Sequence, residues 1–130
     1  GKIMQSNIVP LRHLEAPAVQ TEALYSLQAS LGMNECRNVI ERAVFELSDR
    51  LWLLQKALHD AEMKEVKRIA RSLVAISAQI GLTEFSLVAS DLADCIARGD
   101  IVSIGSVSAR LIRVGERSLF LAVQFPEITG

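Results

Sequence analysis

The feature that most constrains the fold is a run of apolar residues that recur every three or four positions between residues 40 and 58. This spacing places one apolar side chain per turn on a single face of an α-helix, so the segment predicts a long amphipathic helix. Its inner face consists of Ile40, Val44, Leu47, Leu51, Leu54 and Leu58. Asn34 is the expected N-cap, with Glu35 in the first turn. No segment shows the period of two that strands require, so the pattern predicts an all-α protein.

Three further helices are predicted by the same spacing. Their inner faces are Val66, Ile69, Leu73, Ile76 and Ile80, then Phe85, Val88, Leu92, Cys95 and Ile96, and finally Ile104, Val107, Leu111 and Val114. Asp60, Thr83 and Asp100 are the expected N-caps, and Gly81 and Gly99 the expected helix stops. The last helix is expected to run to about residue 122, ahead of a proline at position 126.

Two details at the helix ends complete the predicted pattern. Leu82 and Leu87 occupy the two positions of a hydrophobic staple at the start of the fourth helix in the chain. A first helix is expected between Pro17, a residue suited to a helix start, and Gly32, a residue suited to a C-terminal cap. The loops between the predicted helices are very short, and short loops make consecutive helices antiparallel neighbours.

The chain is therefore expected to be one domain with an up-down antiparallel four-helix bundle over residues 34–122 and an additional N-terminal helix across one end. Residues 1–16 are expected to form an N-terminal arm, residues 17–122 the helical bundle and residues 123–130 a C-terminal tail. With 130 residues, the chain is long enough to bury a core of its own.

Composition excludes several classes of function. The net charge is −1, which gives no basic surface excess for nucleic acid. The longest uncharged stretch, residues 72–83, is too short for a membrane span, which needs about 20 apolar residues. No signal peptide is visible, so we expect a cytoplasmic protein in which Cys36 and Cys95 are buried apolar residues and not a disulfide.

No motif for catalysis or metal binding is present. The sequence lacks a phosphate-binding glycine loop, an HExxH motif and paired cysteines. Its two histidines, His13 and His59, lie too far apart to indicate a metal cluster. We therefore expect no enzyme activity, no catalytic residues, no metal and no cofactor. Arg110, Arg113 and Arg117 share one face of the last helix, which is typical of a solvated face; a patch for an acidic partner is the alternative.

The third predicted helix of the chain, which contains Arg71 and Leu73, has an unusual outer face. At 100° per residue, Arg71 lies about 160° from the inner residue Leu73. The residues that share its side are Lys67, Val74, Ala75 and Ala78. This face is basic at one end and small and apolar at the other, which favours a protein-docking surface. Coverage by the N-terminal segment, or alanines present for helix propensity, are the alternatives.

Residues 51–117 resemble a histidine-containing phosphotransfer (HPt) domain, the four-helix-bundle module of two-component phosphorelays. The family motif reads roughly His-x-Leu-Lys-Gly-Ser-x-x-x-x-Gly, and here the corresponding segment is Ala70-Arg71-Ser72-Leu73-Val74-Ala75, with Gly81 ten residues after Arg71. Ala57-Leu58-His59-Asp60 resembles the preceding helix junction, and Ala97-Arg98-Gly99-Asp100 the Gly-Asp turn. The resemblance implies a bundle that binds a receiver domain or a histidine kinase domain.

The departures from this motif matter most. The family's phosphoacceptor histidine falls at Arg71, its lysine at Val74 and its glycine at Ala75. A guanidinium stays protonated and offers no lone pair, so it cannot accept a phosphoryl group as imidazole does. The resemblance therefore implies a degenerate member, a pseudo-HPt domain that keeps the docking face. Arg71 either pairs with a receiver's carboxylate or phosphate, or is a tolerated exposed residue.

Two other functions remain open. The chain could be an active phosphorelay protein that uses His59, or less favourably His13, as the phosphoacceptor. It could also be a helical interaction protein unrelated to phosphorelays, a homodimer through Val74, Ala75 and Ala78. We expect a monomer or a weak homodimer, without a nucleic-acid or membrane partner.

Overall fold

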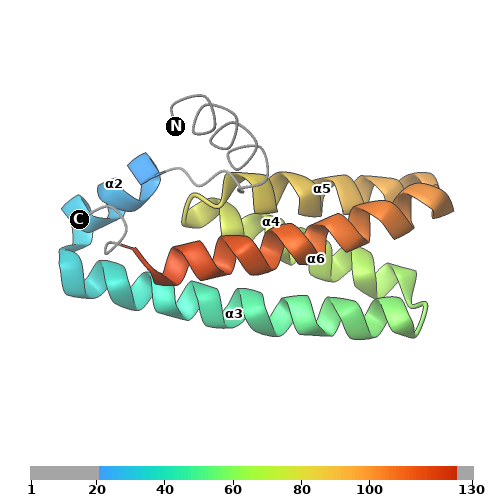
Figure 1. Cartoon of the computed structure of the whole chain (residues 1–130), viewed down its shortest axis with the longest axis horizontal. Coiled ribbons are helices and arrows are strands. Elements are labelled where there is room, and N and C mark those ends of the chain that lie inside the picture. Colours follow the sequence, from blue (N-terminus) through green and yellow to red (C-terminus); the bar gives the residue numbers. More distant parts are fainter. Residues whose placement is uncertain (1–20, 126–130) are drawn as a thin grey trace, which may run out of the picture.

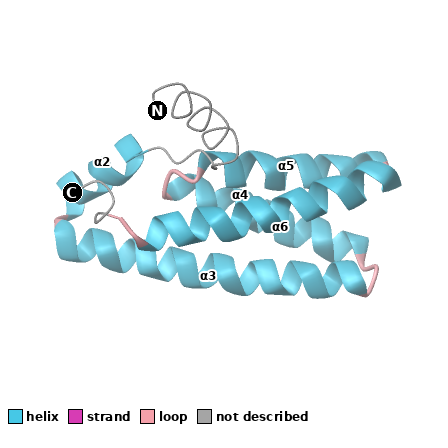
Figure 2. Ribbon diagram, viewed as in Figure 1, coloured by secondary structure: helices cyan, strands magenta, loops and turns pink. Residues whose placement is uncertain are grey.

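The computed structural model describes residues 21–125, which form five α-helices (Figure 1). Their bounds are Thr21–Leu31 for α2, Met33–His59 for α3, Met63–Gln79 for α4, Thr83–Arg98 for α5 and Ile101–Val123 for α6. Helices and short turns account for everything described in this range, with no strand among them (Figure 2). The prediction of an all-α protein is confirmed.

The four longer helices form an up-down bundle. Each of α3, α4 and α5 packs against the next helix in the chain, and α6 returns to pack against both α5 and α3. The remaining helix, α2, packs on α3 at one end of the bundle (Figure 1). This is the predicted arrangement of four helices with an additional helix at an end. The expected arm at residues 1–16, the helix start at Pro17 and most of the tail lie outside the described residues.

The predicted inner faces line the core. Leu47, Leu54, Leu73, Phe85, Leu92 and Leu111 are fully buried, one or two from each helix of the bundle. The edges of the stripes are half-buried, at Val44, Leu58, Ile76, Ile96, Ile104 and Val107. Both cysteines are buried and free, as expected, and burial raises the pKa of the Cys36 thiol. The Cys36 Sγ lies 3.8 Å from the carbonyl oxygen of Leu24, to which it donates across the α2–α3 contact.

Three of the predicted N-caps are wrong. Asn34 lies inside α3, because the single residue Gly32, with φ +85°, makes the whole turn from α2. Asp60 ends α3 as its C-cap and does not start α4, whose N-cap is Glu62. Thr83 is the first residue of α5, and its hydroxyl donates backward to the carbonyl of Gly81 at 3.3 Å instead of accepting from the helix.

The fourth predicted cap is confirmed, and the predicted staple is wrong. Asp100 caps α6: its carboxylate accepts from the Ser103 backbone N–H at 3.2 Å and from the Ser103 hydroxyl at 2.6 Å. Leu82 is itself the N-cap of α5, so Leu82 and Leu87 do not occupy the N′ and N4 positions of a staple, and Leu87 is 60% exposed. Leu87 lies about 140° around the helix from Leu92, outside the apolar stripe. The predicted stops at Gly81 and Gly99 are confirmed, both with positive φ.

Candidate docking face on α4

Arg71 lies near the middle of α4 and is exposed to solvent. Leu73, two residues further on, is fully buried, as the helical phase predicted. Within residues 21–125, no hydrogen bond or ion pair holds the Arg71 side chain. Its five N–H donors therefore face solvent and are available to an external acceptor.

The structure brings all five predicted residues to one side of α4. Ala75 and Ala78 are exposed beside Arg71, and Lys67 and Val74 are half-buried at the edge of the face. At that edge, the Ser86 hydroxyl of α5 donates to the Val74 carbonyl at 3.2 Å. This bond shows that α5 flanks the Val74 side of the face. We call this set, Lys67, Arg71, Val74, Ala75 and Ala78, the α4 face.

The charge of α4 differs in sign from that of the whole chain. The helix carries four basic residues and one acidic residue, a net charge of +3, whereas the whole chain carries −1. Its one acid is already paired: Arg68 donates to both oxygens of Glu65, at 2.9 and 2.6 Å. The hydrogen bond from Arg68 lowers the pKa of Glu65. Lys64, Lys67 and Arg71 are left to set a positive potential along the first half of α4.

This arrangement can bind an anion but cannot act as a phosphoacceptor at Arg71. An arginine with unengaged N–H groups can grip a carboxylate or a phosphate through two parallel hydrogen bonds. The uncharged second half of the helix, with Ala75 and Ala78, lets a partner surface come close to the backbone. The α4 face therefore combines a positive anchor with a small apolar platform.

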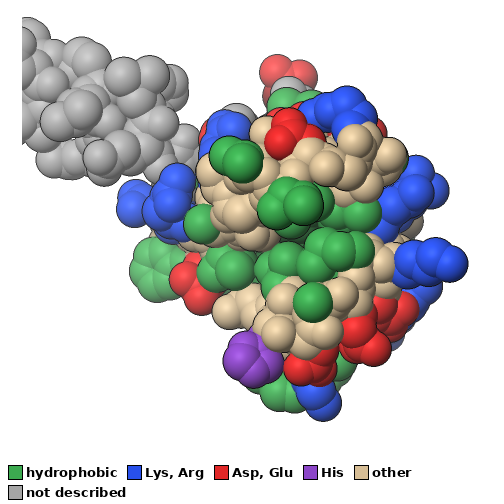
Figure 3. Space-filling view, turned by 90° about the vertical axis from the view of Figure 1, so that its right-hand side faces the viewer, with side chains coloured by type: hydrophobic (Ala, Val, Ile, Leu, Met, Phe, Trp, Pro, Cys, Tyr) green, Lys and Arg blue, Asp and Glu red, His purple; other side chains and the backbone are tan. Residues whose placement is uncertain are grey.

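The structure does not bring His59 to this face. His59 is the last residue of α3 and is exposed, whereas Arg71 lies more than two turns into α4. Figure 3 looks at the end of the bundle that holds the α3–α4 and α5–α6 turns, where hydrophobic side chains gather. Ile101 and Val102, the first residues of α6, are 81% and 85% exposed there. The other predicted candidate, His13, lies outside the described residues.

The arginines of α6 lie away from the α4 face. Arg110, Arg113 and Arg117 are all exposed, and Arg110 forms an ion pair with Glu84 of α5 at 3.5 Å. Over the range 21–125, no group of three or more histidine, cysteine or acidic side chains is placed to hold a metal ion. None of the helices described is long and apolar enough to cross a membrane.

Sequence reasoning missed a second group of exposed residues, on α3. Phe45 and Trp52 are 73% and 60% exposed on the outer side of this helix. The signal was present, because both residues fall outside the stripe that runs through Leu47, Leu51 and Leu54. The periodicity argument uses only the buried stripe, so it does not point to the two large aromatic side chains on the opposite face.

Comparison with known proteins bears on the fold. No protein-family model and no curated protein sequence matches the chain. Among solved structures, it is similar to the crystal structure of histidine-containing phosphotransfer protein B (HptB) from Pseudomonas aeruginosa PAO1, with a TM-score of 0.76 and 21% sequence identity. The similarity covers 84% of this chain and 94% of that chain. The bundle is therefore HPt-like in fold, as the motif resemblance led us to expect.

Proposed function

We propose that this protein is a cytoplasmic, HPt-like signalling module that docks an acidic receiver domain through the α4 face and does not itself carry phosphate. The observation that carries the proposal is an HPt-like bundle with an exposed, unengaged Arg71 where the family motif has its histidine. A histidine kinase domain is the other partner that the resemblance implies.

A receiver domain fits this face because of charge. The phosphorylation site of a receiver is acidic and becomes more so when phosphorylated. The positive half of α4 attracts such a site over several ångströms, and Arg71 provides paired donors for the carboxylate or phosphate. The uncharged half, at Ala75 and Ala78, then packs against the rim of the partner.

Phosphate transfer through this chain is disfavoured by the same residue. Arg71 has no lone pair with which to attack phosphorus at neutral pH. His59 has one, but it lies at the end of α3 without a lysine or glycine in the motif position beside it. The first test is to incubate the protein with labelled, phosphorylated receiver domains of its own organism. We expect no acid-labile phosphoprotein, and a labelled band that disappears in His59→Ala would replace this proposal with an active phosphorelay.

The docking face is tested by placing a charge in it. Ala75→Glu sets a carboxylate next to Arg71 and should weaken binding to the receiver at least tenfold, or about 1.4 kcal/mol, by titration calorimetry. Ala109→Glu is the matched control, because Ala109 is an exposed alanine on α6. Equal affinity of the Ala75→Glu variant and the wild type would place the interface elsewhere.

Restoring the motif tests the reason for the missing transfer. The triple variant Arg71→His, Val74→Lys, Ala75→Gly returns the three family residues to α4. If the chain has lost only the chemistry and kept the docking, this variant should accept label from a phosphorylated receiver that binds the wild type. A receiver that binds the triple variant tightly without any transfer of label would show that the α4 face does not meet the receiver's active site.

A further inference from the structure

The outer side of α3 carries two large aromatic residues in a polar setting. Phe45 is 73% exposed and Trp52 is 60% exposed, although the opposite face of the same helix forms the core. Neither belongs to the α4 face. Exposed aromatic residues grouped on one helix face are typical of an interaction surface.

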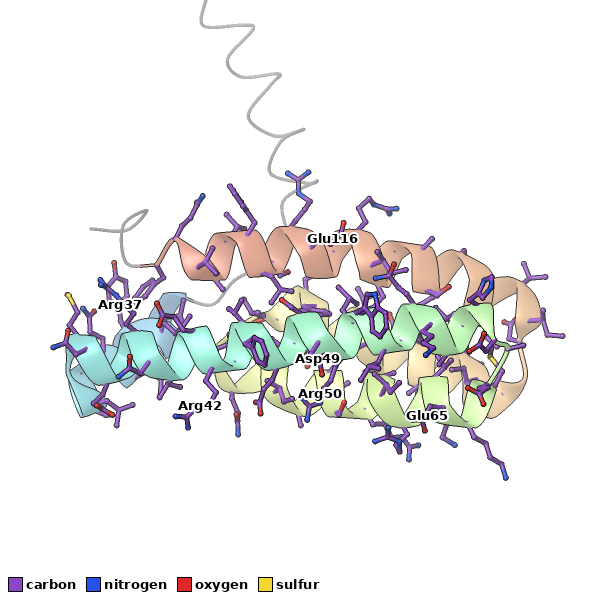
Figure 4. The ribbon with its side chains drawn as sticks, turned by 90° about the horizontal axis from the view of Figure 1, so that it is seen from below. Arg37, Arg42, Asp49, Arg50, Glu65 and Glu116 are labelled. Carbon is purple, nitrogen blue, oxygen red and sulfur yellow. The ribbon has the colours of Figure 1, made fainter. Side chains whose placement is uncertain are left out.

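These aromatics belong to a continuous stripe. Starting from Glu41, steps of four, three, four and four residues lead to Phe45, Ser48, Trp52 and Lys56, and at 100° per residue these five fall within a sector of about 80°. Figure 4 looks onto this side of α3, which is flanked by α6 on one side and α4 on the other, with Asp49 near the middle of the helix. We call these five residues the α3 stripe.

The stripe is flanked by α6 on the side of Glu41. Glu41 and Ile40 line a small cavity together with Ala122 and Val123 of α6. A Cβ at Gly115 of α6 would meet Leu51 of α3 at 3.1 Å. The helix α6 therefore runs along one edge of the α3 stripe.

The order of residues in the stripe is self-complementary. Phe45 and Trp52 lie equally far on either side of the midpoint between Ser48 and Asp49, and so do Glu41 and Lys56. A twofold axis through this midpoint would therefore place Phe45 against Trp52 of a second copy, and Glu41 against Lys56. An acid then faces a base at both ends, with aromatics between, and this arrangement is self-complementary, as an isologous interface must be.

We propose that a second copy of this chain packs antiparallel against the α3 stripe to form a symmetric homodimer. Ser48 at the centre is small enough to allow the two helices to approach. Lys56 already lies 5.8 Å from the centroid of its own Trp52 ring. From there its ammonium group can reach Glu41 of the second copy, and neither residue has an ion pair with another side chain in residues 21–125.

The available surface suits a reversible dimer. Each exposed aromatic offers roughly 150 Å² for burial, so Phe45 and Trp52 supply about 300 Å² per copy before the polar rim is counted. A standard stable interface buries about 800 Å² per partner. The helical rim between Glu41 and Lys56 spans about 22 Å and adds polar contact area around the aromatics, so the interface is smaller than the standard size and suits a weak, reversible dimer.

Sedimentation velocity of the full chain over a range of concentrations tests the dimer. We expect a reversible monomer–dimer equilibrium in the wild type and at least a tenfold higher dissociation constant in Trp52→Glu and Phe45→Glu. Leu87→Glu is the control, because Leu87 is also 60% exposed but lies on α5. A monomer at every concentration would overturn the proposal.

A charge swap tests the register of the pair. Glu41→Lys and Lys56→Glu should each weaken the dimer, because each creates two like-charge contacts across the axis. The double variant should recover most of the lost affinity, since it again sets an acid opposite a base at both ends of the pair, with the two signs exchanged. A dimer that is insensitive to both single changes, or one that Ala75→Glu disrupts while Phe45→Glu does not, would contradict packing through the α3 stripe.

Discussion

Gly115 tests the packing of the bundle most directly, because a single methyl group added there meets the core. It is buried in the middle of α6, and a Cβ at this position would lie 3.0 Å from both Cε1 and Cζ of Phe85 and 3.1 Å from Cδ2 of Leu51. Ordinary contacts to a Cβ begin near 3.4 Å. Gly115→Ala therefore requires the Phe85 ring, which is fully buried, and Leu51 to move by a few tenths of an ångström.

Two effects of opposite sign decide the outcome. Replacing glycine by alanine inside a helix stabilises it by about 1 kcal/mol, through propensity and through the lower entropy of the unfolded chain. Overpacking a dense core costs about 1–3 kcal/mol. Because the Phe85 ring is fully buried and has no free space into which to move, we expect the overpacking cost to exceed the gain in helix stability. The free energy of unfolding should therefore fall by about 1 kcal/mol.

Gly105→Ala on the same helix isolates the packing term. Gly105 is exposed, and a Cβ there would have no atom within 4 Å, so this variant should be more stable than the wild type by up to about 1 kcal/mol. Urea unfolding followed by far-ultraviolet circular dichroism measures both variants. If Gly115→Ala stabilises the protein as much as Gly105→Ala does, the close approach of α6 to Phe85 and Leu51 is not tight, and the reasoning fails.

Three further substitutions, one of them with a control variant, should separate local effects. Asp100→Ala should lower the Tm at neutral pH, because it removes the cap of α6. Hydrogen bonds from Ser103 lower the pKa of Asp100, so the stabilising effect of the carboxylate is present above its unfolded-state pKa and is lost as the pH falls through its folded-state pKa. The Tm difference between variant and wild type should therefore vanish in acid, and a difference that stays constant with pH would contradict the cap. Ala61→Gly should raise the free energy of unfolding by about 0.5 kcal/mol in urea, because Ala61 has φ +56°, and a loss would contradict strain there. Ser118→Ala should raise the free energy of unfolding by about 1 kcal/mol in the same assay, because the buried Ser118 hydroxyl has no hydrogen-bond partner within residues 21–125. Ser77→Ala is the control and should not raise the free energy of unfolding, because it removes a 2.6 Å hydrogen bond to the Leu73 carbonyl.

The bundle itself could be predicted from sequence because burial repeats every turn. Leu47, Leu54 and Leu73 were placed inside by spacing alone, and all three are fully buried. The stops at Gly81 and Gly99 followed from a backbone conformation that glycine adopts at low cost. The apolar pattern recurs over many residues, so one exception does not obscure it. Each helix stop depends on a single steric property of glycine, its low cost at positive φ.

The helix starts were predicted less well because several polar residues near a turn compete for the cap. Asp60 and Thr83 have side chains suited to capping, but the lengths of the turns put Glu62 and Leu82 at those positions. Leu82 occupies the N-cap position of α5 as a buried apolar residue that makes no side-chain cap hydrogen bond, and capping preferences do not predict such a residue there. The prediction for Asp100 is correct because only Gly99 and Asp100 lie between α5 and α6. Gly99 ends α5, so Asp100 is the residue left to cap α6.

The α4 face could be placed by helical phase, but its use depends on chemistry that phase does not reveal. The same counting put Arg71 outside and Leu73 inside, and both placements agree with the structure. The net positive charge of α4 is already present in its sequence, and the structure adds that the one acid, Glu65, pairs with Arg68 and leaves Lys64, Lys67 and Arg71 unpaired within residues 21–125. The identity of the partner depends on the partner's own surface, so binding experiments must supply it.

The two proposed surfaces have a joint consequence for binding. Glu41 of the α3 stripe lines a cavity with Val123 of α6, whereas α4, the helix that carries the α4 face, flanks the opposite side of α3 (Figure 4). A dimer built on the α3 stripe therefore leaves both α4 faces open and presents two docking sites in one particle. A partner with two receiver domains would then bind with an avidity that exceeds the affinity of one site. Trp52→Glu should remove this gain while leaving the affinity for a single receiver domain unchanged, so equal loss for one-domain and two-domain partners would show that the surfaces are not independent.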